Sequence, residues 1–499
     1  MTWPRRAGVL LHPTSLPGPH GIGDLGVAAH RWLETLADAG LGLWQLLPLG
    51  PTGYGDSPYQ VFSAFAGNPL LLAVEGDGDA TLPTRRADFA RVLAHKRPLI
   101  ARAAQAALHD ATRREAFDAF REASRDWLPD FALFMALKDA HGGAPWHAWP
   151  REYALRDASA LANASRRLAG SIARIEAEQF LFATQWRALR EAAAARGVQL
   201  MGDVPIYVAH DSADVWTHRH LFRLHPDGRL RVQAGVPPDY FSATGQLWGN
   251  PLYDWEAVRA DGYAWWIARL RAAFAQFDIV RLDHFRGFAA YWEVAGDATT
   301  AADGQWQPGP GAAFFDAVHA ALGPVPIVAE NLGVITPDVE ALREHGGYPG
   351  MCVLQFAFAP GEGALRPYAF PPHAVAYTGT HDNDTIVGWW SGAEASTQDA
   401  AAATAERAFA ARYLDVRDAP RHWAMIRAAF ASACHTAIVP WQDVLGLGSS
   451  ARMNQPGRAE GNWAFRFAWD DVPDDAVARL RELATTYDRN AAGEPAVER

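Results

Sequence analysis

The sequence has little cysteine and no long apolar run. Its 499 residues include two cysteines, Cys352 and Cys434, which could pair but are expected to be buried free thiols, as in a reducing compartment. It has no stretch of about 18 apolar residues that could cross a membrane. The charged N-terminus is not followed by the apolar core and cleavage site of an export signal. We therefore expect a cytoplasmic protein that does not bind membranes.

Positive charge is also sparse. Lysine occurs only at Lys96 and Lys138, and nearly all of the 45 basic residues are arginines scattered singly among 56 acidic residues. The formal net charge of −11 is mild for this length, and no basic stripe could neutralise a phosphate backbone. Nucleic acid is therefore not an expected partner.

The chain is rich in apolar residues, at 49%, which is enough for a large core. Eight short apolar runs recur, separated by Ala-, Leu- and Arg-rich patterns typical of helices. The runs are Ala7–Leu11, Leu41–Leu47, Val198–Val204, Phe277–Asp283, Pro326–Glu330, Met351–Phe356, Ala374–Thr380 and Ala437–Val444. Near-continuous runs favour parallel strands covered on both faces, and eight favour a closed barrel. The predicted fold is an α/β TIM barrel, (β/α)8.

Two segments interrupt this pattern. The interval between the second and third runs is too long for one helix, so residues 60–196 are predicted to be an insertion with a helical subdomain. Residues 207–253 are rich in Pro, Gly, Asp and aromatics without periodicity, as in a long active-site loop insertion. Only about 55 residues follow the eighth run, too few for a C-terminal β-sandwich. A single catalytic domain over 1–499 is expected.

Acidic residues that end apolar runs are informative, because a barrel places its reacting groups at the carboxyl ends of its strands. Arg281 and Asp283 lie two positions apart and so share one face of a strand. The guanidinium would keep the carboxylate ionised, as a nucleophile requires. An ordinary ion pair at a strand end is the alternative.

Two further acidic positions follow later runs. Glu330 has no basic residue within several positions, so a partly desolvated site could keep it protonated to act on a glycosidic oxygen. A helix N-terminal Glu is the alternative. His381 and Asp382 could bind sugar hydroxyls and stabilise an oxocarbenium-like transition state, although a helix N-cap or a metal site would use the same residue types. Carboxylates after three strands of one barrel would meet at one mouth, as glycoside chemistry requires.

Seven stretches of the sequence match, in order, the motifs of one known family. They are Leu11–Pro17, Ser57–Gln60, Gly202–Val208, Arg281–Gly287, Ala329–Gly333, Gly379–Asn383 and Arg452–Asn454. By these motifs the chain resembles the amylomaltases, the 4-α-glucanotransferases also called disproportionating enzymes, in family 77 of the glycoside hydrolases within the α-amylase clan. The resemblance covers almost the entire chain.

The resemblance implies a retaining enzyme that transfers a segment of an α-1,4-glucan to the 4-hydroxyl of glucose or of another glucan chain. Asp283 would form the covalent intermediate, Glu330 would be the acid/base and Asp382 the transition-state stabiliser. The residues implied to contact sugars are Ser57, Tyr59, Asp203, Asp239, Gln246, Trp248, Arg281, His381 and Asn454. No metal or cofactor is expected, and the chain would act on maltooligosaccharides as a monomer or weak homodimer.

The segment 236–250 resembles the family's mobile loop over the acceptor subsites. Such a loop would favour a sugar over water as the attacking group. A loop that merely packs on the barrel rim is the alternative. Two other functions stay open: an α-glucan hydrolase with the same carboxylates, and an inactive glucan-binding protein, against which the intact trio of acids argues.

Three motifs suggest nucleotide or metal binding but lack the neighbouring residues that such sites require. Gly21–Gly26 matches the dinucleotide pattern G-x-G-x-x-G, yet it does not directly follow a strand. The glycine-rich segment 50–57 lacks the Gly-Lys-Ser/Thr of a phosphate-binding loop. His210, His218 and His220 share no standard zinc spacing with their acidic neighbours, which favours loop histidines over a metal site.

Overall fold

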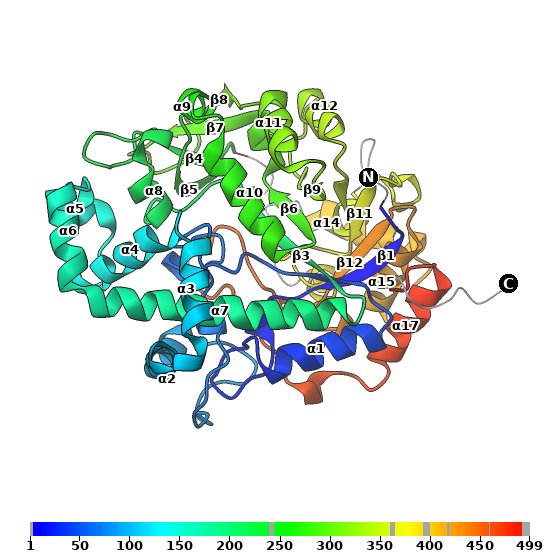
Figure 1. Ribbon diagram of the computed structural model, residues 1–499. Coiled ribbons are helices and arrows are strands. Elements are labelled where there is room, and N and C mark those ends of the chain that lie inside the picture. The colour runs from blue at the N-terminus through cyan, green and yellow to red at the C-terminus, as the bar shows by residue number, and fades with distance from the viewer. Residues whose placement is uncertain are drawn as a thin grey trace.

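The structure is a computed structural model that describes residues 3–238, 244–359, 365–392, 400–416, 420–458 and 460–491. Eight parallel strands form its centre (Figure 1). They are β1 (Arg6–Leu10), β2 (Leu43–Gln45), β3 (Gln199–Pro205), β6 (Ile279–Asp283), β9 (Ile327–Ala329), β10 (Gly350–Val353), β11 (Ala374–Tyr377) and β12 (Thr436–Pro440). Each overlaps one of the eight apolar runs, and the predicted TIM barrel is confirmed.

The strands pair in chain order, and β12 returns to pair with β1. The circle is completed between β9 and β10 without a regular ladder. The N–H of Ala329 donates to Pro349 O at 2.9 Å, and the N–H of Met351 donates to Oδ1 of Asn331 at 2.8 Å. A side-chain amide therefore supplies part of the hydrogen bonding at this seam.

Helices surround the barrel. Outside the segment between β2 and β3 they are α1 (Val27–Asp38), α8 (Ala213–Thr217), α9 (Trp255–Ala260), α10 (Ala264–Gln276), α11 (Ala312–Leu322), α12 (Pro337–Gly346), α13 (Ile386–Ser391), α14 (Ala400–Tyr413), α15 (Arg421–Ala431), α16 (Trp441–Val444) and α17 (Ala476–Thr486). Helix α1 illustrates why they form: its buried residues Ala29, Trp32, Leu33 and Leu36 recur at helical spacing on one face. No helix among the described residues has the length and apolarity needed to cross a bilayer.

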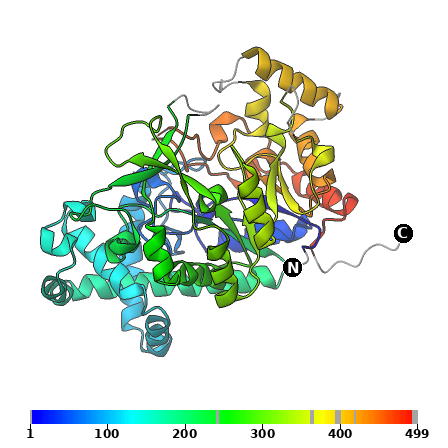
Figure 2. The same cartoon turned by 90° about the horizontal axis from the view of Figure 1, so that it is seen from above.

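The long interval between β2 and β3 is helical. It contains α2 (Phe89–His109), α3 (Arg114–Ala123), α4 (Leu128–Ala140), α5 (Arg151–Ala154), α6 (Ala158–Arg167) and α7 (Ala169–Ala194). Asp88 and Asp157 start α2 and α6 by accepting hydrogen bonds from backbone N–H groups of the first turn. In Figure 2 this region, in cyan, lies on the opposite side of the molecule from the gold and orange helices α14 and α15.

A second, antiparallel sheet lies beside the barrel. Its order is β5 (Gln246–Pro251), β4 (Val232–Val236), β7 (Ala290–Ala295) and β8 (Gln305–Pro308). The sequence of 207–253 predicts no periodic structure, whereas the structure places two strands there. These strands are short and contain Gly235 and Gly249, and β4 pairs with β7, which is distant in sequence. Local periodicity therefore could not reveal them.

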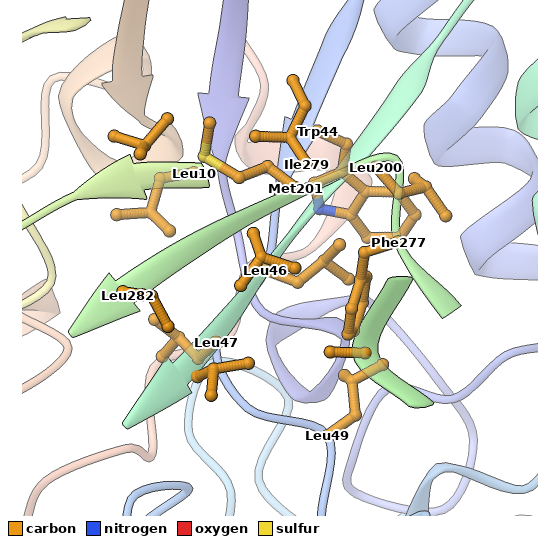
Figure 3. Close-up of a cluster of buried hydrophobic side chains, with 14 of the residues drawn as sticks. Leu10, Trp44, Leu46, Leu47, Leu49, Leu200, Met201, Phe277, Ile279 and Leu282 are labelled. Atoms are coloured by element: carbon orange, nitrogen blue, oxygen red, sulfur yellow. The ribbon is translucent and has the colours of Figure 1, made fainter. Parts of the chain in front are cut away.

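Apolar side chains from β1, β2, β3 and β6 form one buried cluster, with its neighbours from the connecting segments (Figure 3). The indole N–H of Trp44 donates to Leu11 O at 2.7 Å, so the largest side chain of the cluster leaves no unsatisfied donor. Burying a large apolar side chain stabilises the fold by roughly 1.5–3 kcal/mol. This cluster therefore holds the strands whose carboxyl ends carry the predicted site.

The end of the barrel away from the site is closed by Arg489, which is fully buried after α17. Its guanidinium donates to the backbone carbonyls of Arg6, Phe430, Ser432 and Cys434 at 2.6–3.0 Å. Both cysteines of the chain are buried free thiols, as predicted.

Replacing Arg489 with Met would leave buried carbonyl groups without a donor. We expect Arg489→Met to lower the free energy of unfolding by about 3 kcal/mol, measured by urea denaturation. Arg85→Met, which removes an ion pair of a largely exposed side chain with Asp471, is the control and should cause little change. Equal stabilities of the two variants would contradict this role.

Candidate active site

Two of the predicted catalytic acids follow neighbouring strands. Asp283 is the last residue of β6 and Glu330 directly follows β9, where Leu282 pairs with Ala329. Adjacent strands lie about 4.8 Å apart, so both carboxyl groups begin at the same rim of the barrel. The N–H of His284 donates to Oε2 of Glu330 at 2.7 Å, which ties the two strand ends together.

Arg281 organises the floor of the site. Its Nη1 lies 2.8 Å from Oδ1 of Asp283 and 2.7 Å from Oδ2 of Asp203, its register partner on β3. Tyr59 donates its hydroxyl to Oδ2 of Asp203 at 2.7 Å. The side chain of Asp203 has no exposed surface, whereas that of Asp283 is 26% exposed. Asp203 therefore supports Arg281 and Tyr59 from behind, and Asp283 is the carboxylate that a ligand can reach.

Glu330 has a different electrostatic environment from Asp283. Burial raises the pKa of its carboxyl to about 7. The charge of Arg281 and hydrogen bonds from the N–H groups of His284 and Leu332 act in the opposite direction, while the charge of Asp283 raises the pKa further. Glu330 can therefore exchange a proton near neutral pH, as the sequence analysis anticipated from its apolar surroundings.

The third acid enters the site on the loop after β11. Asn454 donates to Oδ1 of Asp382 at 2.6 Å, and the imidazole Nε2 of His381 lies 3.4 Å from Oδ2. The ring of His381 stacks on Tyr59, with ring centroids 5.1 Å apart. Because Tyr59 is bonded to Asp203, a continuous series of contacts links Asp382 to the Arg281–Asp283 pair. The side chain of Asp382 is 46% exposed and accessible to a ligand.

The antiparallel sheet brings an aromatic residue to the same mouth. Trp248 on β5 meets the ring of His284 edge to face, with centroids 4.8 Å apart. Gln60 donates to Trp248 O at 3.2 Å, and the indole N–H donates to Oε1 of Gln246 at 3.3 Å. The predicted sugar contacts Gln246 and Trp248 therefore lie next to the residue that follows Asp283.

Of the remaining predicted sugar contacts, Ser57 lies beside Tyr59 and accepts a hydrogen bond from its N–H at 3.2 Å. Asp239 falls outside the described residues. Of the histidines considered for a metal, His218 and His220 lie near each other, with ring centroids 6.2 Å apart. Among the described residues no group of three or more His, Cys, Asp or Glu could hold an ion.

The residues predicted from the sequence did not include Asp443, the third residue of α16, which is almost completely buried. Burial raises the pKa of its carboxyl to about 7. A signal was present, because Asp443 is the acidic residue next to the end of the eighth apolar run. His284, whose backbone and ring contact Glu330 and Trp248, was not predicted either.

An ion-paired carboxylate beside a desolvated acid at the strand ends of a TIM barrel is the arrangement that enzymes use to break and re-form glycosidic bonds. Residues 11–471 match the family described as 4-alpha-glucanotransferase, glycoside hydrolase family 77. The chain belongs to this family and is an enzyme that transfers segments of glucans.

The chain is similar to known proteins over nearly the whole length of both. The chain is 48% identical to the 4-alpha-glucanotransferase of Thermus thermophilus, over 98% of this chain and 100% of the relative. It is 47% identical to that of a Synechocystis strain, over 97% of this chain and 98% of the relative. The solved amylomaltase from Streptococcus agalactiae, in complex with acarbose, is 36% identical with a TM-score of 0.92, and the match covers 97% of this chain and 100% of that one.

The raised pKa of Glu330 predicts a pH dependence. If this group must donate a proton, activity requires its neutral form, which is lost as the pH rises through about 7. We expect kcat/KM for maltotriose to fall about tenfold per pH unit above this pKa. Burial raises the pKa of Asp443 to the same range. The decline in kcat/KM at high pH should therefore also be measured in Asp443→Asn, where it should persist if Glu330 is the group responsible. A profile that stays flat to about pH 9 would remove the general-acid role.

Proposed function

We propose that the chain is a retaining 4-α-glucanotransferase that acts by double displacement, with Asp283 as nucleophile, Glu330 as acid/base and Asp382 as transition-state stabiliser. The observation that carries the proposal is the contrast between two neighbouring carboxyl groups. Asp283 is paired with the Arg281 guanidinium, while burial raises the pKa of Glu330 to about 7. One group is thus ion-paired and positioned for attack, and the other can carry a proton.

In the first step the Asp283 carboxylate attacks the anomeric carbon of the donor glucan. The bond from that carbon to the glycosidic oxygen breaks, and Glu330 gives its proton to the leaving oxygen. A glycosyl ester on Asp283 results. In the second step the 4-hydroxyl of an acceptor attacks the same carbon, Glu330 takes up its proton, and Asp283 leaves as a carboxylate. Two inversions give net retention of configuration.

Asp382 completes the site by stabilising the positive charge that develops on the sugar ring. Its hydrogen bond from Asn454 leaves acceptor capacity for sugar hydroxyls, and His381 beside it can bind an adjacent one. Tyr59 and Ser57 line the same side. We assign Asp203 a supporting role behind Arg281, because its buried carboxylate offers no surface to a sugar. The sugar contact of Asp239 stays a prediction.

The acceptor glucan is proposed to bind against Trp248, which belongs to the segment 236–250. A sugar bound against the indole would displace water from the glycosyl ester, and the acceptor would be glucose or a maltooligosaccharide. Gln60 donates to the backbone carbonyl of Trp248 and the indole N–H donates to Gln246, so the ring offers a positioned surface.

We further propose one catalytic domain over 1–499, with 60–196 and 207–253 as insertions, because one apolar core includes both barrel and inserted helices. The domain would work without a metal or cofactor as a monomer or weak homodimer. The two buried free thiols suit a reducing compartment such as the cytoplasm.

Incubation with maltotriose tests the function. Transfer predicts glucose together with chains longer than the substrate; shorter sugars alone would indicate a hydrolase, and no turnover a binding protein. Asp283→Ala should lower the rate on the order of 10⁴-fold or more, since no group would remain to form the ester. Retained activity in this variant, or a β-anomeric product by NMR, would remove the nucleophile assignment.

Trp248→Ala tests the exclusion of water. We expect the ratio of hydrolysis to transfer to rise roughly 3- to 10-fold, because an acceptor sugar would lose its aromatic surface while the carboxyl groups stay in place. Released glucose and elongated chains, measured in the same reaction, give this ratio. Trp306→Ala, an exposed tryptophan of β8, is the matched control and should leave it unchanged.

A further inference from the structure

The loop between β11 and α13 carries His381 and Asp382, so the position of two proposed substrate contacts depends on how it is held. Inside the loop, Oδ1 of Asn383 accepts hydrogen bonds from the N–H and the hydroxyl of Thr380 at 2.8 and 2.9 Å. These bonds shape the turn, but they do not fix it to the barrel. Residues outside the loop supply that attachment. In the middle of the loop, Nη2 of Arg452 donates to Asp382 O at 2.6 Å and the N–H of Asn454 donates to His381 O at 3.0 Å.

Asp443 provides the attachment at the two ends of the loop. Its Oδ2 accepts the hydroxyl of Thr378 at 2.7 Å, and its Oδ1 accepts the N–H of Ile386 at 2.7 Å. Thr378 directly follows β11 and Ile386 is the first residue of α13. All three residues are at most 1% exposed. One carboxylate from α16, the helix that follows the eighth strand, therefore joins the two ends of the loop.

A small pocket lies against the loop. Its volume of about 20 Å³ holds about one water molecule. The pocket is partly open and is lined by residues of the loop, of the β1 end and of the β12 end, among them His12, Thr380, His381, Gln442 and Asp443. Because van der Waals packing is incomplete at this pocket, hydrogen bonds contribute more to the position of the loop here.

Burying the carboxyl group of Asp443 costs free energy that a purely structural residue could avoid. Among the described residues it has no ion-pair partner, and an unpaired buried carboxylate is unfavourable. An apolar residue of the same shape would avoid this cost but would accept neither hydrogen bond. The carboxylate supplies two acceptors in one plane, directed at two donors that lie on either side of the loop.

We propose that Asp443 is a positioning residue. Its carboxylate accepts hydrogen bonds from Thr378 and Ile386 and so keeps His381 and Asp382 in the position where they contact the sugar. The inference rests on the proposed function, because it acts through these two side chains. Asp443 does not itself contact substrate.

Thr378→Val tests the proposal with little change in volume, and Thr436→Val is its matched control. Thr436 is also buried and its hydroxyl makes one side-chain hydrogen bond, to His435 at 2.7 Å, but it lies at the opposite end of β12. Both variants should lower Tm by a few degrees. Thr378→Val alone should lower kcat for maltotriose about 10-fold with KM within about twofold, the pattern of a lost transition-state interaction. Equal kcat values in the two variants would overturn the proposal.

Variants of Asp443 separate hydrogen bonding from charge. In Asp443→Asn the amide oxygen can accept from Ile386 and the amide N–H₂ can donate to the hydroxyl of Thr378, so kcat should stay within about threefold of the unchanged enzyme. Asp443→Leu loses both bonds, and kcat should fall on the order of 100-fold. If Asn were as inactive as Leu, or Leu as active as Asn, the proposal would be wrong.

A double-mutant cycle tests whether the loss of kcat in Thr378→Val acts through His381. In a His381→Ala background the further loss caused by Thr378→Val should shrink at least threefold, because both changes act through the same loop. Multiplicative losses would contradict this. The unchanged enzyme is assayed alongside: its failure to elongate maltotriose would reject the proposed function, whereas normal elongation with equal Thr378→Val and Thr436→Val rates would reject the role of Asp443 alone.

Discussion

The guanidinium of Arg281 lies between two carboxylates at the floor of the barrel mouth. A buried cation is tolerated only when it is paired and hydrogen-bonded, so Arg281 requires both Asp203 and Asp283 to point inward from adjacent strands. This requirement fixes the side-chain arrangement at the ends of β3 and β6. Through Asp203 it also sets the position of Tyr59, and the stacked ring of Tyr59 in turn sets that of His381. The geometry of the site thus extends outward from one ion pair.

The same ion pair separates the properties of two acids that the backbone brings close together. Asp283 is next to the cation and faces the mouth, whereas Glu330 sits over the neighbouring strand in a drier environment. A β-barrel provides equivalent positions at every strand end, so identical functional groups acquire different roles only through their neighbours. The reaction chemistry therefore resides in the contacts between strands more than in any single residue.

The sequence was sufficient for the barrel, because apolar runs are a local pattern. It also pointed to the three acids through the polar residues that end these runs, and their catalytic roles stay a proposal. It was not sufficient for features created by pairing over long distances. The strands β4 and β5 are recognisable only once β7 is beside them. Likewise, Asp203 and Asp443 lie one residue before the ends of their apolar runs, and only the positions of Tyr59 and Thr378 show that their oxygens are already occupied.

The seam between β9 and β10 has a consequence for motion. On that side the strand that leads to Glu330 is held by a backbone bond from Ala329 and by the amide of Asn331, where a full ladder would otherwise lie. Local opening of a structure requires less energy where fewer backbone bonds must break. Separation of β9 from β10 should accordingly cost less free energy than separation of strands joined by a full ladder. Glu330, the proposed acid/base, directly follows β9 at this seam. Small breathing of the cylinder would shift this carboxyl relative to its fixed partner on β6.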